Sequence, residues 1–222
     1  MSLFKLFVDH SKKDSFVNSI RKKRFAYQKL LIEKLLETKQ EIKILDIGGE
    51  IEFWKHMGWE NNRCTIYLLN LEAVPTITPT YGFIQITGNA LALPFEKGEF
   101  DLIFSNSVIE HVGSYTNQQV FAAETKRVCT KYMIQTPSIW FPLEPHSLLP
   151  FFQAIPHPIR AILIMFFNIN YFPKQKTYQA ALATSKSTLM FSKKRFQALF
   201  PEADIQVERL LGIPKSYTAI KM

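Results

Sequence analysis

The chain has 222 residues, of which 47% are hydrophobic and 21% are charged, so it is long and apolar enough to bury the core of one large α/β domain. This composition excludes an intrinsically disordered chain. The formal net charge is +8, and residues 1–40 hold ten of the 27 basic residues but only four of the 19 acidic ones. The positive charge is therefore concentrated near the N-terminus.

The two cysteines, Cys64 and Cys129, stand alone without a CxxC pair. We therefore expect neither a disulfide framework nor a zinc site, and no bound metal. Lys5 and Asp9 interrupt the first apolar residues, so a secretory signal peptide is not expected. Together these features favour a cytoplasmic protein.

The first predicted element is an amphipathic helix over residues 14–38. Asp14 or Ser15 is its candidate cap, and its apolar residues recur mostly at intervals of three or four. These are Phe16, Ile20, Tyr27, Leu30, Leu31 and Leu35. The basic residues 21–24 could bind phosphates, but a solvated helix face is the favoured interpretation. We treat residues 1–40 as a basic helical extension and residues 41–222 as the main domain.

Five short apolar runs follow, each expected to be a strand. Their spacing and uniformly apolar character are typical of a parallel sheet that is covered on both faces. The runs are residues 42–47, 64–72, 81–90, 100–107 and 131–138.

Helical segments are expected between and after these runs. Val120, Ala123 and Val128 indicate a crossover helix over residues 117–129, and the tail predicts a helix followed by strands near Ile205–Leu210 and Tyr217–Lys221. The short link between the last two strands requires an antiparallel hairpin. The expected fold class is α/β: a Rossmann-like, doubly wound, mostly parallel sheet with an antiparallel C-terminal hairpin strand and an N-terminal helix.

Residues 138–174 form an apolar insertion with six prolines between Pro142 and Pro173. Within it, residues 161–173 carry no charge, but a membrane-spanning helix needs about 20 residues. The segment is therefore expected to be a buried helix, a lid over an acceptor, or an interfacial patch. Its large side chains are Trp140, Phe141, Phe151, Phe152, Ile155, Phe166, Phe167 and Tyr171.

Ligands of open parallel sheets bind at the carboxyl ends of the strands. After the first predicted strand, Gly48 and Gly49 allow the backbone a tight turn and a close approach to a ligand. The GxGxxG pattern that seats a pyrophosphate is absent, and Glu50 and Glu52 would repel a diphosphate. A cationic cofactor such as S-adenosylmethionine fits this loop better.

Several stretches together resemble class I S-adenosylmethionine-dependent methyltransferases, in particular the small type 11-like domains. "ILDIGG" is similar to their first motif, "GNALALPFEKGEFDLIFSNSVIEHV" to a stretch of the form DAxxLPFxxxxFDLVxxxxVxEHV, and "AAETKRV" to the segment after it. The resemblance covers about residues 42–137. It implies methyl transfer from S-adenosylmethionine.

The resemblance also implies roles for residues at the strand ends. Those placed around the methionine part, the ribose and the adenine of the cofactor are Asp46, Gly48, Gly49, Asn70, Leu71, Asn89, Ala90, Ser105 and Asn106. Asn70 and Asn89 stand where the family usually has acidic residues, and an amide lacks the charge-assisted hydrogen bond. Glu50 and Glu52 replace later glycines, and we expect them on the first turn of a helix, where carboxylates favour the helix dipole. Direct contact of Glu50 with the cofactor's ammonium is the alternative.

Candidate catalytic residues follow the fourth and fifth strands. Methyl transfer from a sulfonium needs a base only when the nucleophile is protonated, and the candidates are Glu110, His111 and His146, with Glu144 beside the last. For Glu110 and His111 a purely structural role is the favoured alternative. For His146 the two interpretations are equally balanced.

The expected function is methyl transfer to a small-molecule or lipid-like acceptor. A catalytically inactive domain that binds the cofactor or a partner is the first alternative, because of the altered glycine loop and the two asparagines. A nucleic-acid methyltransferase is disfavoured, because "SNSV" at residues 105–108 replaces the Asn-Pro-Pro-Tyr type of signature. If residues 161–172 are exposed beside the basic helix, the pair would suit contact with an anionic membrane surface.

Overall fold

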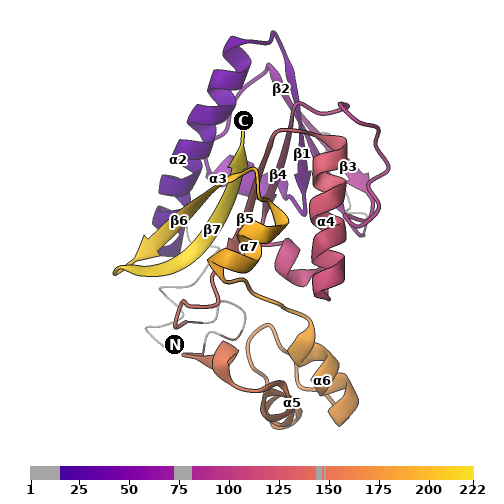
Figure 1. The fold of residues 1–222 in the computed structure, drawn as a ribbon, viewed down its shortest axis with the longest axis vertical. Helices are drawn as coiled ribbons and strands as arrows, with labels where there is room; N and C mark the ends of the chain where they lie inside the picture. The colour runs from indigo at the N-terminus through magenta and orange to yellow at the C-terminus, as the bar shows by residue number, and fades with distance from the viewer. Residues whose placement is uncertain (1–15, 73–81, 144–146, 148) are drawn as a thin grey trace.

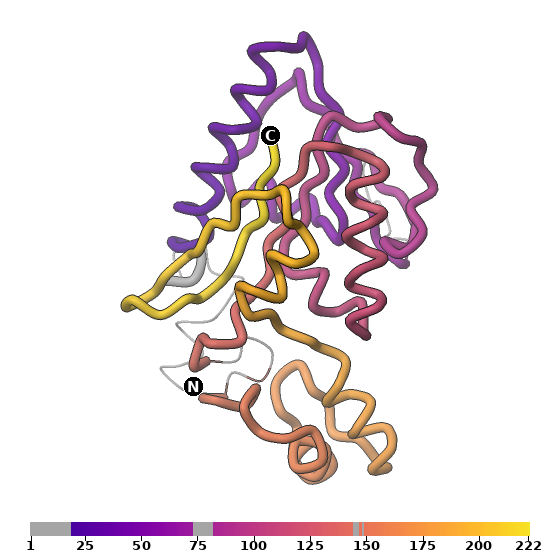
Figure 2. The backbone as a smooth tube through the Cα atoms, in the orientation of Figure 1, coloured from indigo at the N-terminus to yellow at the C-terminus, as the bar shows by residue number. Residues whose placement is uncertain are grey.

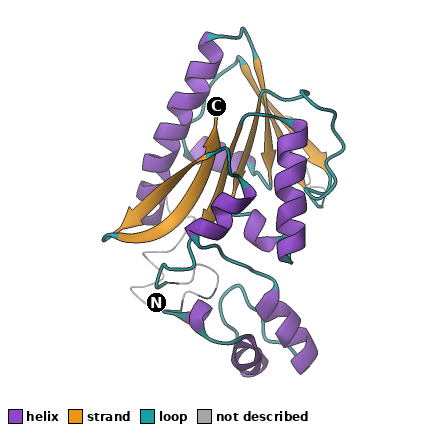
Figure 3. Cartoon of the chain, in the orientation of Figure 1, coloured by secondary structure: helices purple, strands orange, loops and turns teal. Residues whose placement is uncertain are grey.

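The fold was analysed in a computed structural model, which describes residues 16–72, 82–143, 147 and 149–222. A seven-stranded sheet lies between two layers of helices, and a smaller helical unit extends from its lower end (Figures 1 and 2). Helices and strands alternate along most of the chain (Figure 3). The predicted fold class is confirmed.

The sheet has the strand order β3-β2-β1-β4-β5-β7-β6. All pairs from β3 to β5 are parallel, and β7 is antiparallel to both β5 and β6. The strands are β1 (Ile42–Ile47), β2 (Cys64–Asn70), β3 (Phe83–Thr87), β4 (Leu102–Asn106), β5 (Tyr132–Pro137), β6 (Asp204–Leu210) and β7 (Ile213–Lys221). The predicted antiparallel hairpin is the β6–β7 pair.

The helices that cover the sheet form two layers. One face packs against α2 (Phe16–Glu37) and α3 (Ile51–His56), and the other against α4 (Tyr115–Val128) and α7 (Lys193–Leu199). Ser114 and Ser192 cap α4 and α7 through their hydroxyl oxygens. On the first face, Phe25 meets the rings of Trp54 and Trp59 edge-on. Such pairs stabilise a core beyond their buried area.

The predicted N-terminal helix exists, and Leu35 is buried and Leu31 packs against the core as predicted, but the rest of the buried face differs from the expected one. Tyr27 and Leu30 are 43% and 48% exposed, whereas Phe25, Ile32 and Leu36 are buried. The pairs Phe25–Ile32 and Ile32–Leu36 follow helical spacing, so the sheet selected a stripe rotated from the predicted one. The exposed residues Lys22 and Lys23 agree with a solvated face, whereas Arg21 and Arg24 are half-buried.

The crossover helix shows a similar correction. Val120 is 37% exposed and Ala123 is exposed, while Val128 is buried as expected. The core face of α4 is instead formed by Phe121, Ala122, Thr125 and Val128, together with the amide of Gln118. Hydrophobicity alone did not identify this face, because its residues Gln118 and Thr125 are polar.

Part of the apolar insertion forms a separate small core. Its elements are η2 (Phe152–Ala154), α5 (His157–Phe166) and α6 (Tyr178–Lys186), so the unit extends beyond the predicted end at residue 174. Phe152, Ile164 and Ala181 lie at its centre. Among the described residues no helix is long and apolar enough to cross a bilayer.

Candidate functional site

The candidate site lies at the carboxyl edge of the sheet. The chain passes from β1 outward to β2 and β3, and then returns to β4 on the other side of β1. The order therefore reverses between β1 and β4, where doubly wound folds form their ligand crevice. In Figure 1 this edge is the lower end of β1, β4 and β5, which faces the α5–α6 unit.

The loop after β1 contains the two glycines. Gly48 has φ +72°, and a Cβ there would lie 2.4 Å from the Cγ2 atom of Val108. At Gly49 a Cβ would lie 2.2 Å from the carboxylate oxygen Oδ2 of Asp46. The backbone N–H of Gly48 donates to the carbonyl of Leu69 at 2.7 Å. Only glycines allow the loop to pass this close to its neighbours.

Asp46 is buried beneath this loop. Its Oδ2 accepts a hydrogen bond from the indole Nε1 of Trp54 at 2.8 Å, and the residue is 2% exposed. Desolvation raises the pKa of Asp46 to about 8; the Trp54 hydrogen bond opposes this rise, and the charge of Glu50 adds to it. A cation placed here would favour the ionised carboxylate.

The two acidic residues after the glycines lie at the start of α3, as predicted. Glu50 is the N-cap residue but its side chain caps no N–H, and Glu52 is in the first turn. Glu52 pairs with Lys55 at 3.2 Å, with both side chains more than half exposed. Such an exposed pair contributes little stability. Glu50 forms no side-chain hydrogen bond with Asp46 or Gly49.

Asn70 ends β2 and supports the glycine loop. Its Nδ2 donates to the carbonyl oxygen of Gly49 at 2.9 Å. An aspartate could not make this bond, because a carboxylate has no donor at neutral pH. This explains why an amide is suitable here, and its Oδ1 is left to accept from a ligand. Leu71, the next residue, is 74% exposed.

Asn89 and Ala90 follow β3 in a turn. The side-chain Oδ1 of Asn89 accepts from the backbone N–H of Leu91 at 2.9 Å, and its own carbonyl accepts from Ala92. This is an Asx turn, which Asn forms readily. Ala90 is 9% exposed. Asn89 therefore shapes the loop, with its amide nitrogen still available.

Ser105 and Asn106 end β4 beside the glycine loop. Ser105 is buried and donates to the carbonyl of Ile47 at 2.9 Å, so it ties β4 to β1. The Oδ1 atom of Asn106 is buried and accepts no hydrogen bond. A buried acceptor without a donor is costly, so Asn106 is suited to a ligand that brings an N–H or O–H.

The predicted catalytic residues have different surroundings. Glu110 is fully buried in η1 (Ile109–His111), and its Oε2 accepts from the hydroxyl of Thr136 at 2.9 Å. His111 is exposed, with Nδ1 3.4 Å from the hydroxyl of Thr188. Glu110 thus holds the end of β5. His146 and its neighbour Glu144 lie outside the described residues.

Sequence reasoning assigned no role to Trp54, Val108 or Thr136. Trp54 lies eight residues after Asp46 on the first helix after the loop, and it holds the buried carboxylate in place. Val108 closes the space around Gly48, and Thr136 anchors Glu110. Val108 lies within the motif stretch of residues 88–112, but the role of each of the three depends on a contact that the fold creates.

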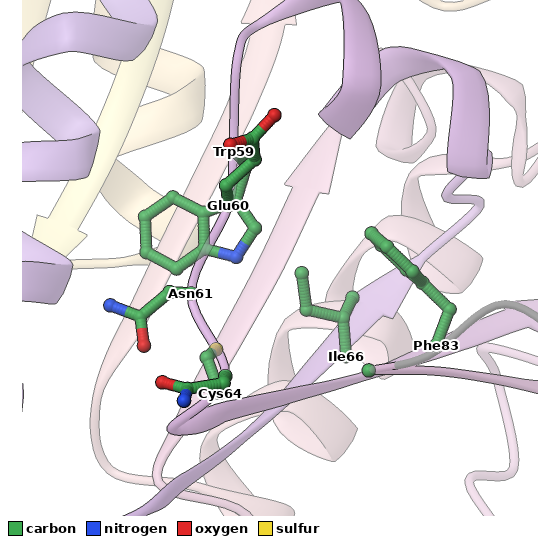
Figure 4. A pocket seen from close by; sticks show the side chains of 8 residues that line it. Trp59, Glu60, Asn61, Cys64, Ile66 and Phe83 are labelled. Atoms are coloured by element: carbon green, nitrogen blue, oxygen red, sulfur yellow. The ribbon is translucent and has the colours of Figure 1, made fainter.

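A second hollow lies away from this edge, at the amino ends of β2 and β3. It has a volume of about 240 Å³ and is lined by Trp59, Cys64, Ile66 and Phe83 among others (Figure 4). Burial raises the pKa of the Cys64 thiol to about 12, with the charge of Asp101 adding to the effect. Cys64 is therefore no nucleophile. The hollow belongs to the opposite edge from the glycine loop.

Comparison with known proteins gives part of the chain its family. Residues 54–132 match the family model of a methyltransferase domain. This range contains the ends of β2, β3 and β4 that surround the glycine loop. The chain carries a class I S-adenosylmethionine-dependent methyltransferase domain. S-adenosylmethionine is the methyl donor of this class, as the resemblance implied.

Solved structures share the fold of this methyltransferase domain at low sequence identity. An S-adenosylmethionine-dependent methyltransferase from Methanosarcina mazei is 14% identical, with a TM-score of 0.50 over 86% of this chain and 95% of that chain. The CurJ carbon methyltransferase is 12% identical, with a TM-score of 0.53 over 85% of this chain and 51% of that one. These likenesses concern the fold alone.

A further structure shows why the fold does not decide the chemistry. A protein from Rhodobacter sphaeroides, described as a proposed zinc-dependent alcohol dehydrogenase, is 9% identical, with a TM-score of 0.52 over 84% of this chain and 86% of that chain. In the part of the chain that the structure describes, no cluster of three or more His, Cys, Asp or Glu side chains could hold a metal. The methyltransferase domain also lacks the pyrophosphate motif.

The chain spans only about half the length of some of these relatives. It covers 55% of a proposed O-methyltransferase from Nostoc punctiforme and 51% of the CurJ carbon methyltransferase. No curated protein sequence matches the chain. These comparisons therefore do not identify the methyl acceptor.

Proposed function

We propose that this protein transfers a methyl group from S-adenosylmethionine to a small-molecule or lipid-like acceptor at the carboxyl edge of the sheet. The observation that carries the proposal is the glycine loop beside the buried carboxylate of Asp46. Bound S-adenosylmethionine supplies an activated methyl group on a sulfonium. Its two cationic groups suit a loop with carboxylates.

The residues present fit this cofactor. Gly48 and Gly49 leave space that side chains would fill, and the Oδ1 atom of Asn106 lacks a donor. We assign Asp46, the two glycines and Asn106, with Ser105 holding β4 to β1, to the methionine part. Asn70 and Leu71 are assigned to the ribose, and Asn89 and Ala90 to the adenine.

Catalysis then depends mainly on positioning. A nucleophile held near attack geometry in a water-poor pocket gains most of the required rate enhancement. Where the nucleophile begins protonated, His111 is the candidate base among the described residues, with His146 as the alternative. Glu110 is assigned a positioning role through Thr136, because it is fully buried.

The first test is calorimetric titration with S-adenosylmethionine and S-adenosylhomocysteine, with NADH as the control ligand. We expect both sulfur compounds to bind and NADH to give no heat of binding, because a diphosphate meets carboxylates at this loop. Absence of binding at millimolar cofactor would contradict the proposal. Cofactor binding without a methylated product from any acceptor would favour the inactive, partner-binding alternative.

The exposed apolar face of helix α5 supports the proposal that the acceptor is lipid-like. Ile159, Ile162 and Phe166 lie three and four residues apart on α5, are 51%, 48% and 64% exposed, and continue into Phe167 at 60%. Lys174 and Lys176 are exposed in the segment that follows. An apolar helix face next to cations is typical of contact with an anionic lipid surface.

We therefore expect the protein to co-sediment at low salt with vesicles of phosphatidylcholine and phosphatidylserine. The double variant Phe166→Ser/Phe167→Ser should lower the bound fraction several-fold, since about 1.5–3 kcal/mol is lost per large apolar side chain. Leu211→Asn, at the 93% exposed tip of the β6–β7 hairpin, is the matched control. Wild-type protein that stays in the supernatant would remove this proposal.

A further inference from the structure

Two cationic side chains contact one carboxylate between α2 and the β6–β7 hairpin, and a third cation lies nearby on α2. The Oε2 atom of Glu208 lies 3.1 Å from Nη1 of Arg24 and 3.3 Å from Nζ of Lys215, and accepts a hydrogen bond from the hydroxyl of Ser216 at 2.7 Å. The side chains of Arg24, Glu208 and Lys215 are 14%, 15% and 19% exposed. Arg21 lies one helical turn before Arg24.

This cluster is level with the carboxyl edge of the sheet. Ser216 is paired with Pro137 at the end of β5 and, on its other side, with Glu208. The carbonyl of Lys215 accepts from the N–H of Ser138 at 2.9 Å. In Figure 1 the lower end of α2 meets the hairpin beside the same edge, above the α5–α6 unit. The cations therefore lie at the same edge of the sheet as the candidate site, on its β5 side.

The positive charge of the cluster exceeds its negative charge. Glu208 is the common partner of Arg24 and Lys215, whereas the half-buried Arg21 makes no ion pair or hydrogen bond with any described residue. Desolvation by burial lowers the pKa of all three cations. A guanidinium stays charged nonetheless, and a partly desolvated charge without a counterion is unfavourable. The three cations therefore outnumber the one carboxylate that contacts the cluster.

Glu50 connects this cluster with the glycine loop. Its charge acts on Arg21, where it opposes the lowering of the pKa, and also on Asp46. Tyr171, in the segment after α5, acts on Arg21 as well. Arg21 is therefore within electrostatic range of a residue that follows the glycine loop and of one that follows α5.

We propose that Arg21 binds an anionic group, a carboxylate or a phosphate, on the methyl acceptor. The inference rests on the proposed function and narrows its substrate class. A guanidinium can hold either group through two parallel hydrogen bonds. Arg24 and Lys215 are paired with Glu208, so they fix the hairpin and contribute positive electrostatic potential. Arg21 has no such pair among the described residues, so its guanidinium can engage the acceptor. An anion there would reduce the excess positive charge of the cluster.

The test uses protein saturated with S-adenosylhomocysteine and small probes of matched shape. Benzoate and phenyl phosphate are titrated against benzamide at low ionic strength, and binding is followed by the NMR signal of the Arg21 side-chain N–H and by calorimetry. We expect the two anions to bind and benzamide not to. A short-chain phosphatidic acid, compared with phenyl phosphate, distinguishes a lipid headgroup from a free phosphate monoester.

Variants on one helix provide the controls. Arg21→Gln should weaken binding of the anions by about tenfold or more, Arg21→Lys should fall between it and wild type, and Lys22→Gln, at an exposed neighbouring position, should bind as wild type does. Once an acceptor is found, Arg21→Gln should raise its KM with little change in kcat. Equal binding of benzoate and benzamide, or equal behaviour of Arg21→Gln and Lys22→Gln, would overturn the inference.

The same variants separate this inference from the proposed function. Arg21→Gln should bind S-adenosylmethionine with wild-type affinity, because Arg21 is not assigned to the cofactor. If the cofactor fails to bind wild-type protein while the anions bind through Arg21, methyl transfer is refuted and the anion site stands. If the cofactor binds and the anions do not, the acceptor is not anionic.

Discussion

Gly49→Ala should weaken S-adenosylmethionine binding by about 10- to 100-fold, equivalent to the roughly 1–3 kcal/mol that overpacking costs. The new Cβ would lie 2.2 Å from Oδ2 and 2.3 Å from Cγ of Asp46. Asp46 cannot turn aside cheaply, because it is buried and held by Trp54. The loop must therefore move outward, into the space assigned to the cofactor. Calorimetric titration of the variant with S-adenosylmethionine measures the change.

Gly58→Ala is the control for the general effect of replacing a glycine. Gly58 has φ +68°, and a Cβ there would meet no atom within 4 Å. This variant should lose about 1 kcal/mol of stability through backbone strain and keep wild-type affinity. Gly49→Ala protein that is folded by circular dichroism and binds as tightly as wild type would show that the loop after β1 is not the cofactor site.

The second prediction concerns the pH dependence that Asp46 confers. The pKa of this carboxyl is about 8 in the folded protein, well above the ordinary value of about 3.9 for an aspartate. Below pH 4 both the folded and unfolded states hold the proton. Between about pH 4 and 8 the unfolded chain releases it and the folded protein keeps it, so the free energy of unfolding falls as pH rises, by at most about 1.4 kcal/mol per pH unit. Above this range the contribution is constant.

Asp46→Asn should remove this dependence, because Asn resembles the protonated acid and can still accept from Trp54. Urea denaturation at pH 5, 6, 7 and 8 (about one-unit steps across the window) should show a falling free energy of unfolding for wild type relative to the variant. A constant difference between the two proteins across that range would contradict the raised pKa.

Cofactor binding should show the opposite trend for the same reason. A ligand with two cationic groups favours ionised Asp46, so the affinity of wild-type protein should rise with pH up to about 8 and binding should release a proton. Calorimetry in buffers of different ionisation enthalpy counts that proton. Asp46→Asn should bind more weakly and release none. Proton release that is equal in both proteins would assign it to another group.

The strand pattern and the motif at the ends of the strands were readable from the chain alone. Apolar runs such as residues 42–47 and 131–138 need no partner to identify them, because strands covered on both faces are apolar throughout. The tail between Ile205 and Lys221 revealed the hairpin because its link is too short for a crossover. The order of residues along the chain determines these features.

The buried faces of the helices were harder to predict from the sequence. Tyr27 and Leu30 were assigned to the core of the N-terminal helix, and Val120 to that of the crossover helix, yet all three are exposed. A helix with apolar residues on more than one side can dock along several stripes. Which stripe docks depends on the shape of the sheet, and in α4 the chosen one includes the polar residues Gln118 and Thr125.

The sequence by itself determined the fold class, the glycine loop and the family of the domain, because each is encoded in residues that are close along the chain. Only the tertiary structure decided that Trp54 holds Asp46, that Asn70 supports the carbonyl of Gly49, and that Arg24 and Lys215 share the carboxylate of Glu208. Those pairs come from different elements. Their burial, which sets pKa values and charge balance, exists only once the sheet has brought the elements together.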